Sequence, residues 1–392
     1  MLARSDLRGV ADLASALAPP PGDPGPMRAV REIVADVRAR GDAALRDLTE
    51  RFDGCRVDDL RVPNSALTAA LDGLDPAVRE SLDYAHGEIA AYHVAQRNGG
   101  FTLDRDGVRL TERVVPVARA GCYVPGGRAA YPSSVLMTAV PARIADVDDV
   151  VLCVPPGSDG TVPAVTLAAA ALAGVDEVYR VGGAQAIAAM AYGTQSIRAV
   201  DVIVGPGNVY VALAKREVAG VVGIDGFNGP SEVAIVADAV DRALAEVLAG
   251  APQRAELEDT LRTTGRVVLV DDVDAARTAI DVLAPEHLEL ACADAEKLAD
   301  DVRNAGAIFV GNYAPAALGD YLAGVNHVLP TARTARFASA LRVDTFCKHV
   351  HVVDVDASAF ARVAPAVATL AEVEGLVEHA RSVTIRSEGE ES

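Results

Sequence analysis

Between Arg113 and Asp238 the chain alternates short β-branched runs with Ala-rich segments of helical spacing, and this alternation constrains the fold most. Each run ends in Gly or Pro, which are the residues that punctuate secondary structure. Strands and helices in series form βαβ units whose strands lie parallel in one sheet. Because ligands bind such sheets at the carboxyl ends of the strands, the sequence predicts a site there.

The same patterns predict individual elements along the chain. Expected strands of this layer cover residues 113–124, 149–154, 177–181, 199–204, 220–224 and 232–237, with helices beginning near 133, 162, 184 and 208. A second α/β layer is expected from strands at 266–272 and 307–312 and from helices at 244–248, 256–261 and 295–302. A helix, turn, helix is expected over 27–52, and the tail is expected to hold a strand at 349–355 and a helical stretch over 358–381.

Charge and cysteine content exclude several classes of protein. The formal net charge of −19 opposes binding to nucleic acid or to an anionic membrane surface. No stretch of the sequence is apolar for long enough to span a membrane, and acidic and Pro-rich residues interrupt the first thirty. The five cysteines are far apart without a CxxC, which disfavours disulfides and a thiolate zinc site. We therefore expect a cytoplasmic protein.

Three Gly-rich turns, VPGGR, VGGAQ and VGPGN, follow expected strands. The GxGxxG fingerprint is absent, so a nucleotide site has to be argued from these turns and from Tyr123, Gln185 and Asn208 beside them. Backbone N–H groups in such turns can hold phosphate. The alternative is that these residues only stabilise the turns, and a role as a helix N-cap accounts well for Asn208.

Two histidines are the best candidates for proton transfer. His287 follows Glu286, and His327 follows Asn326, both in apolar segments expected to be loops. A carboxylate beside an imidazole suits an oxidation that continues past the aldehyde, because one group removes the alcohol proton and the other activates water. The alternative is that each is a satisfied structural histidine.

Nine segments in order resemble the histidinol dehydrogenase family. They are DVRARGDAALRDLTERFDG, LDPAVRESLDYAHGEIAAYHVAQ, AGCYVPGGRAAYPSSVLMTAVPARIA, VYRVGGAQAIAAMAYGT, VDVIVGPGNVYVALAKREV, GPSEVAIVADA, APEHLEL, GDYLAGVNHVLPT and AEVEGLVEHARSVTIR. The resemblance implies a homodimer that performs two successive NAD-dependent oxidations, from alcohol through aldehyde to acid.

The resemblance also implies the fold: α/β, with two incomplete Rossmann-like domains with parallel sheets, a helical N-terminal part and a small C-terminal dimerisation tail. The expected division has four parts. They are 1–122, the N-terminal helical part and the start of the first α/β domain; 123–232, the inserted NAD-binding domain; 233–338, the rest of the first domain; and 339–392, the tail.

Site residues follow from the resemblance position by position. It implies NAD contacts at Tyr123, Gln185 and Asn208, water activation by Glu286 and proton abstraction by His287. Substrate contacts are implied at Ser231, His327 and Glu374, and two of the family's four zinc ligands at Asp320 and His379.

The chain departs from the family pattern at the zinc site. A strand and helix with a Gln-x-x-His pair, which supplies the other two ligands, is missing after GPSEV, and no histidine lies between His93 and His287. Since zinc normally takes three or four protein ligands, we expect no tightly bound zinc. Asp320 would then bind a substrate ammonium and His379 would donate a hydrogen bond.

Three functions remain open at this point. The first is a zinc-independent, NAD-dependent oxidoreductase acting on a small amino alcohol. The second is an authentic L-histidinol dehydrogenase with a rearranged metal site. The third is a non-catalytic binding relative, which the retention of Glu286 and His287 disfavours.

Overall fold

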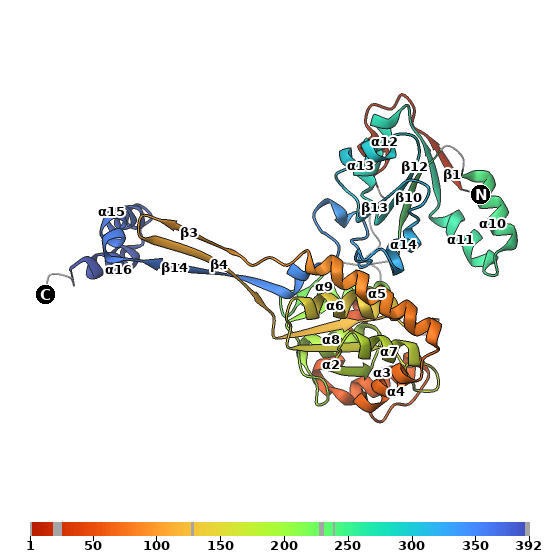
Figure 1. The fold of residues 1–392 in the computed structure, drawn as a ribbon, viewed down its shortest axis with the longest axis horizontal. Coiled ribbons are helices and arrows are strands. Elements are labelled where there is room, and N and C mark those ends of the chain that lie inside the picture. Colours follow the sequence, from red (N-terminus) through yellow and green to blue (C-terminus); the bar gives the residue numbers. More distant parts are fainter. Residues whose placement is uncertain (1, 19–25, 127–128, 227–230, 238–239, 389–392) are drawn as a thin grey trace. The chain divides into compact units, whose positions relative to one another are not determined.

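The computed structural model describes residues 2–18, 26–126, 129–226, 231–237 and 240–388 (Figure 1). The chain separates into two compact units. Unit 1 comprises Met1–Arg97 and Val117–Phe346, and unit 2 comprises Asn98–Pro116 and Cys347–Ser392. The four-part division expected from the sequence draws its boundaries elsewhere and stays a prediction.

A six-stranded sheet forms the core of unit 1, in the order β2-β7-β6-β5-β8-β9. Five of its strands run parallel, and only β2 is antiparallel, at one edge. The central strands are buried along their length because helices cover both faces. The strands are β2 (Arg61–Val62), β5 (Arg119–Tyr123), β6 (Asp149–Val154), β7 (Glu177–Arg180), β8 (Val202–Val204) and β9 (Gly223–Ile224).

The helices that connect or cover these strands begin within two residues of their expected positions. The βαβ alternation is therefore confirmed. The connecting helices are α6 (Pro132–Ile144), α7 (Ala164–Leu172), α8 (Gly183–Tyr192) and α9 (Val209–Val218); the N-terminal ones are α2 (Met27–Arg40), α3 (Asp42–Asp53), α4 (Asn64–Asp72) and α5 (Pro76–Val94). Helices α2 and α3 pack against α8, while α4 packs against α7 and α5 against α6.

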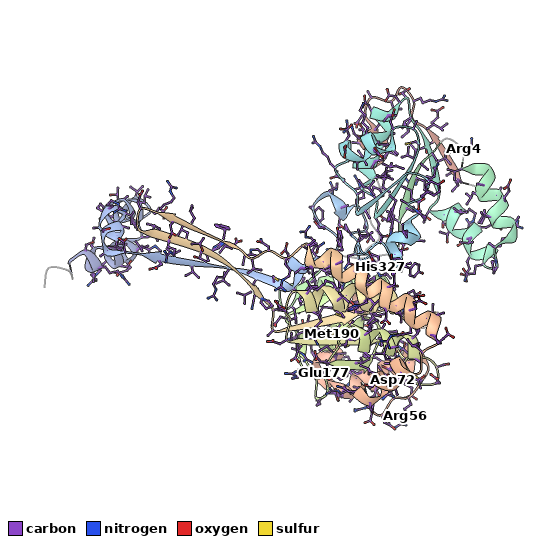
Figure 2. The ribbon with its side chains drawn as sticks, in the orientation of Figure 1. Arg4, Arg56, Asp72, Glu177, Met190 and His327 are labelled. Carbon is purple, nitrogen blue, oxygen red and sulfur yellow. The ribbon has the colours of Figure 1, made fainter. Side chains whose placement is uncertain are left out.

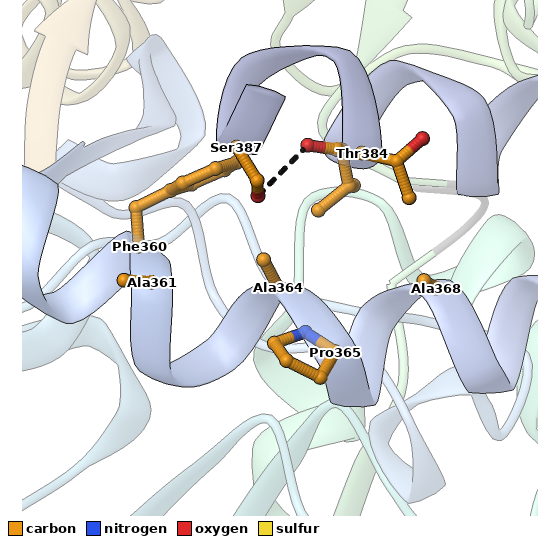
Figure 3. Close-up of a pocket in the computed structure, with 8 residues that line it drawn as sticks. Phe360, Ala361, Ala364, Pro365, Ala368, Thr384 and Ser387 are labelled. Carbon is orange, nitrogen blue, oxygen red and sulfur yellow. Dashed lines mark hydrogen bonds between the residues drawn. The ribbon is translucent and has the colours of Figure 1, made fainter. Parts of the chain in front are cut away.

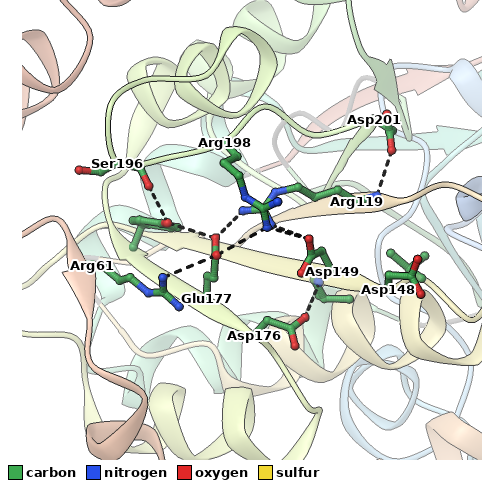
Figure 4. Close-up of polar contacts among 12 residues, drawn as sticks. Arg61, Arg119, Asp148, Asp149, Asp176, Glu177, Ser196, Arg198 and Asp201 are labelled. Atoms are coloured by element: carbon green, nitrogen blue, oxygen red, sulfur yellow. Dashed lines mark hydrogen bonds and ion pairs between the residues drawn. The ribbon is translucent and has the colours of Figure 1, made fainter.

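An ion-pair network ties the amino ends of three strands of this sheet together (Figure 4). Buried Arg119 at the start of β5 pairs with Glu177 at the start of β7, and with Asp149 at the start of β6 at 3.1 Å. Arg198 adds a second contact to Asp149 at 2.7 Å. The charged side chains at the amino edge of the sheet are therefore used in ion pairs with one another. We expect a ligand at the opposite edge, where the strands have their carboxyl ends.

The second α/β region of unit 1 contains two separate sheets. One is three-stranded and parallel, in the order β10-β12-β13, and the other pairs β1 with β11. The strands are β1 (Ala3–Asp6), β10 (Val233–Ala237), β11 (Arg266–Leu269), β12 (His287–Ala291) and β13 (Ala307–Val310). The helices are α1 (Leu13–Ala16), α10 (Asp241–Gly250), α11 (Arg254–Thr263), α12 (Val273–Leu283), α13 (Ala295–Asp301) and α14 (Ala316–Tyr321). The expected second α/β layer is present.

The single strand expected over 113–124 is wrong. The structure makes two strands of it: β4 (Val108–Pro116) in unit 2 and β5 in unit 1. Pro116 lacks an amide hydrogen and closes β4, because it cannot continue the ladder. The N–H of Val117 then bonds the carbonyl of Phe346 at 2.8 Å, so the chain leaves one unit and enters the other here.

Unit 2 combines an antiparallel sheet with two helices. The sheet order is β14-β4-β3, with β3 (Phe101–Arg105) and β14 (Cys347–Val355) flanking β4. The helical stretch expected over 358–381 is divided into α15 (Ala357–Val373) and α16 (Val377–Glu388). Gly375 adopts φ +73, a left-handed conformation that ends a helix and that glycine adopts without strain.

The fold class is confirmed as α/β with mostly parallel sheets and a helical N-terminal part. Two 3-10 turns, η1 (Thr334–Arg336) and η2 (Val343–Phe346), complete the described elements. Among the residues that the structure describes, no helix is both long enough and apolar enough to cross a membrane.

Candidate functional site

Three turns at the carboxyl edge of the six-stranded sheet meet around Tyr123. Its hydroxyl accepts a hydrogen bond from the N–H of Gly183 at 3.0 Å. Gly205 packs so closely that a Cβ there would lie 2.0 Å from the Tyr123 carbonyl oxygen. The turns that follow β5, β7 and β8 are thus held against one another, as the βαβ pattern predicts.

Gln185 and Asn208 start the helices that leave two of these turns. Gln185 lies in the first turn of α8 and is 2% exposed. The Asn208 oxygen accepts from the N–H groups of Tyr210 and Val211 at 3.0 and 3.2 Å, so it caps α9. This cap is the structural role that the sequence left open, and it leaves only the amide nitrogen of Asn208 for a ligand.

A buried ion pair contacts the backbone of the VGPGN turn at Gly205. Lys215 in α9 lies 2.6 Å from Asp225, and both side chains are 1% exposed. Asp225 also accepts from the N–H of Gly205 at 2.7 Å, while the Lys215 ammonium bonds the Gly205 carbonyl. Sequence reasoning missed this pair. Its signal is a lysine on the apolar face of a helix, among Val211, Ala214 and Val218.

Glu286 and His287 stand at the amino end of β12, where β10 holds them. Glu286 accepts the N–H of Glu232 through Oε2 at 2.8 Å, and His287 Nδ1 lies 3.0 Å from the Glu232 carbonyl oxygen. The parallel register pairs Val233 with His287. Glu286 is only 6% exposed and His287 only 9%. His287 was expected in a loop, and it is instead the first residue of a strand.

The contact to a carbonyl oxygen defines which nitrogen of His287 can react. Because Nδ1 donates to the Glu232 carbonyl, Nε2 is the nitrogen left to exchange a proton. Asp320 Oδ1, at the end of α14, lies 3.6 Å from this Nε2. Glu286 Oε2 lies 3.5 Å from Nδ1. The imidazole therefore sits between two carboxylates.

His327 joins this group to the six-stranded layer (Figure 2). Its Nδ1 lies 2.9 Å from the Asp320 carbonyl oxygen, and its Nε2 lies 3.1 Å from the hydroxyl of Ser134, in the first turn of α6. Neighbouring Asn326 donates to the carbonyl of Met137 at 2.7 Å. These contacts fix the loop that follows α14 against α6.

Nearby charges shift the pKa values of the site. Burial alone would lower the pKa of His287, but Asp320 and Glu286 outweigh it and raise that pKa to about 10. Burial lowers the pKa of His327. Burial also raises the pKa of Glu232. With the carboxylates of Asp320 and Glu286 beside His287, the site favours a ligand that carries positive charge.

Other expected site residues are not brought into this group. Ser231 is exposed and precedes Glu232. Glu374 ends α15 and His379 lies in α16; both are exposed and belong to unit 2. Parts of the VPGGR and GPSEV motifs, residues 127–128 and 227–230, lie outside the described residues. The roles of Ser231, Glu374 and His379 stay predictions.

Sequence reasoning also missed Glu232 and Ser134. Glu232 acts through its backbone, and no pattern of side chains reveals a carbonyl that orients an imidazole. Ser134 lies in a helix that was expected, but its partner His327 is distant in sequence. Only the paired register of β10 and β12 and the loop after α14 reveal both contacts.

The family model described as histidinol dehydrogenase matches residues 24–244 and 236–387. The chain belongs to the histidinol dehydrogenase family. A histidinol dehydrogenase of Parasynechococcus marenigrum is 47% identical, covering 90% of this chain and 89% of the relative. One from Rhodospirillum rubrum is also 47% identical, covering 91% of each. The crystal structure of histidinol dehydrogenase from Elizabethkingia anophelis has a TM-score of 0.92 at 28% identity, covering 100% of this chain and 99% of that chain.

Membership in the histidinol dehydrogenase family confirms the resemblance seen in the motifs. It also makes the protein an oxidoreductase of an NAD-dependent family. The matches are interrupted, however. One alignment runs over 398 positions, more than the 392 residues of this chain, while covering 92% of it, so several tens of positions in it have no residue here. The two segments matched by the family model meet at 236–244, at the end of β10.

Proposed function

We propose that this protein oxidises L-histidinol with NAD, first to the aldehyde and then to the acid. The observation that carries the proposal is the Glu286–His287 pair, held by Glu232 with Nε2 directed at Asp320. Relatives at 42–47% identity that bear the name histidinol dehydrogenase support histidinol over a generic small amino alcohol. They favour the second of the three functions that the sequence left open.

Each of the two oxidations removes one proton and one hydride from the substrate. The raised pKa of His287 means that its imidazole must first release a proton, and pairing of the substrate ammonium with Asp320 favours this release. Neutral His287 then accepts the hydroxyl proton at Nε2 while the carbinol hydrogen leaves as hydride to the nicotinamide, giving aldehyde and NADH. In the second step Glu286 takes a proton from water as the water oxygen bonds the aldehyde carbon, and protonated His287 returns its proton to the carbonyl oxygen, giving the hydrate. The hydrate then gives a hydroxyl proton to His287 Nε2 and its carbon-bound hydrogen, as hydride, to another NAD, giving the acid and NADH.

We propose that this protein holds no tightly bound zinc. Of the four zinc ligands that the family pattern implies, this chain matches two, Asp320 and His379. Across the described ranges no three His, Cys, Asp or Glu side chains are grouped so that they could share a metal ion. In this proposal the proton transfers depend on His287 and Glu286 alone. The substrate ammonium pairs with Asp320, whose carboxylate is 41% exposed and already lies beside His287 Nε2.

A substrate panel tests this proposal. Purified protein with NAD is given histidinol and a series of other amino alcohols, and NADH absorbance is followed. We expect the highest kcat/KM for histidinol, with the activity retained in EDTA. His287→Asn should abolish it, whereas His349→Asn, on the exposed strand β14, serves as the matched control and should not. Activity that EDTA removes and zinc restores would contradict the metal-free site.

A different amino alcohol is the second candidate, and the interrupted family match at 236–244 favours it. The segment missing there follows β10, the strand that holds Glu286 and His287. A changed pocket wall at this place would change which side chain the substrate can carry. In the same panel, higher kcat/KM for another amino alcohol than for histidinol would select this candidate.

We also propose that the protein is a homodimer whose contact includes unit 2. Apolar side chains stand exposed on its helices: Leu370, Val373, Val377 and Ile385 are 52–82% exposed, with Val373 the most exposed at 82%. A groove of about 450 Å³ lies between α15 and α16, lined by Phe360, Ala364, Pro365 and neighbours (Figure 3). A second copy would cover this surface, since such patches are rare on monomers. Light scattering should give twice the chain mass, and Val373→Asp should reduce it.

A further inference from the structure

One carboxylate oxygen of Asp53, at the last residue of α3, is buried without a hydrogen-bond partner among the described residues. This oxygen is Oδ2, and none of the ion pairs found within the described part of the chain includes it. Burial raises the pKa of Asp53 to about 6. Because a buried carboxylate oxygen without a hydrogen bond costs stability, its presence points to a ligand that uses it.

The packing of α3 places Asp53 beside the VGGAQ turn. At the start of α3, Asp42 bonds Gln195 and Ser196, which directly follow the end of α8. The two helices pack together with the start of α3 beside the residues that follow α8, which is an antiparallel arrangement. The end of α3 therefore lies near the start of α8, where Gly183 bonds Tyr123.

Strand pairing leads to the same edge. The carbonyl of Leu60 accepts from the N–H of Arg180 at 2.8 Å, at the carboxyl end of β7, and β2 then runs antiparallel to β7. The segment that joins Asp53 to β2 thus passes over the carboxyl edge of the sheet. The charge of Asp53 also contributes to raising the pKa of the Tyr123 hydroxyl, a second sign that the two are close.

We propose that Asp53 accepts hydrogen bonds from the ribose hydroxyls in the adenosine half of NAD and thereby selects NAD over NADP. A carboxylate at a Rossmann-type strand edge suits a ribose 2′-hydroxyl and repels a 2′-phosphate. The turns around Tyr123 offer backbone N–H groups to the adjoining pyrophosphate. This inference rests on the proposed NAD site at Tyr123, Gln185 and Asn208.

The test measures kinetics with both dinucleotides for Asp53→Asn, with Asp53→Ser as a second variant. Since hydrogen bonds to charged groups contribute about 1.5–3 kcal/mol, we expect the KM for NAD to rise roughly 10- to 100-fold with kcat within about twofold. The kcat/KM ratio of NADP to NAD should rise at least about tenfold. Asp58→Asn, an exposed carboxylate on the same segment, is the matched control and should change neither quantity.

Stability separates a binding role from a structural one. If Asp53 serves the ligand, removing its buried charge should leave the melting temperature unchanged or higher while NAD binding weakens. Unchanged KM and unchanged dinucleotide preference would overturn the inference, as would a joint loss of kcat and stability.

Direct titration with NAD and NADP separates this inference from the proposed function. Wild-type protein that binds NAD but oxidises no histidinol would end the proposed function, and weaker NAD binding by Asp53→Asn would still support the role of Asp53. Wild-type protein that binds no dinucleotide would overturn both.

Discussion

Two of the sheets of unit 1, the six-stranded sheet and β10-β12-β13, present candidate residues at opposite ends of their strands. Tyr123, Gln185 and Asn208 follow the carboxyl ends of strands in the six-stranded sheet, whereas Glu286 and His287 stand at the amino end of β12. The first arrangement follows from parallel βαβ topology. The position of Glu286 and His287 depends instead on the local backbone. Ala284 ends α12 in a left-handed conformation, and Pro285 then leads into β12. Under the proposed function, cofactor binding belongs to one sheet and proton transfer to the other.

The two sheets also differ in completeness. The six-stranded sheet is continuous and its central strands are buried. In the other region β10 and β11 each have one paired neighbour among the described strands, and Val233 and Ile235 of β10 are exposed. The interruption in the family match falls at the end of β10.

The sharpest way to break this division of roles is His287→Gln. General base catalysis contributes about 10²- to 10⁴-fold, so kcat should fall by that amount. The KM for NAD should stay within about twofold, because His287 does not belong to the six-stranded sheet. Steady-state kinetics measures both. A KM for NAD that rises with the fall in kcat would show that the two sheets do not divide these roles.

Lys215→Met probes the complete sheet. Removing one partner of a buried ion pair costs about 3–5 kcal/mol, because Asp225 is left buried and uncompensated. Urea unfolding should show this loss, and the double variant Lys215→Met with Asp225→Leu should recover a large part of it. Exposed Arg28→Met, whose partner Glu32 is also exposed, is the control and should cost less than about 1 kcal/mol. A double variant less stable than the single one would contradict this account.

Hydrogen exchange compares the sheets directly. Amides of β10 and β11 should exchange on the order of a hundredfold faster than those of β5 and β6, because their sheets are short and partly exposed. Mass spectrometry of protease fragments reports each strand separately. Equal protection in all four strands would show that the divided region is as cooperative as the complete one.

The smallest effect concerns Asp53 and pH. Its pKa of about 6 in the folded protein lies above the ordinary 3.8, so between these values the folded chain holds a proton that the unfolded chain has lost. Stability therefore falls as pH rises through this window. Because the residue is only partly buried, we expect Asp53→Asn to gain about 1 kcal/mol above pH 6 and little below pH 4. Equal gains at both pH values would exclude titration of Asp53 as the cause.

Sequence patterns predicted those parts of the molecule that local physics determines. Alternating runs and Gly-rich turns gave the parallel sheet and the meeting of Tyr123 with its neighbouring turns. Pro116 was visible in the sequence, yet the separation of β4 from β5 depends on which strand each one pairs with, namely β14 or β6. The spacing of apolar residues within one segment does not show which distant segment it pairs with.

The candidate site shows the same limit. Glu286 and His287 were found because their chemistry is in their side chains. The carbonyl of Glu232 and the approach of Asp320 to His287 arise from register and from the loop after α14, so the sequence did not reveal them. Asp53 was missed because an unpaired carboxylate is apparent only once its surroundings are known.

The most direct test of the central claim is the amount of NADH formed per histidinol by the wild-type protein and by Glu286→Gln. If His287 serves the first oxidation and Glu286 the second, the wild type should form two NADH per histidinol. The variant should stop near one and release aldehyde that a carbonyl reagent traps. No NADH from the wild type, or two from the variant at an unchanged rate, would contradict the assignment of chemistry to the start of β12.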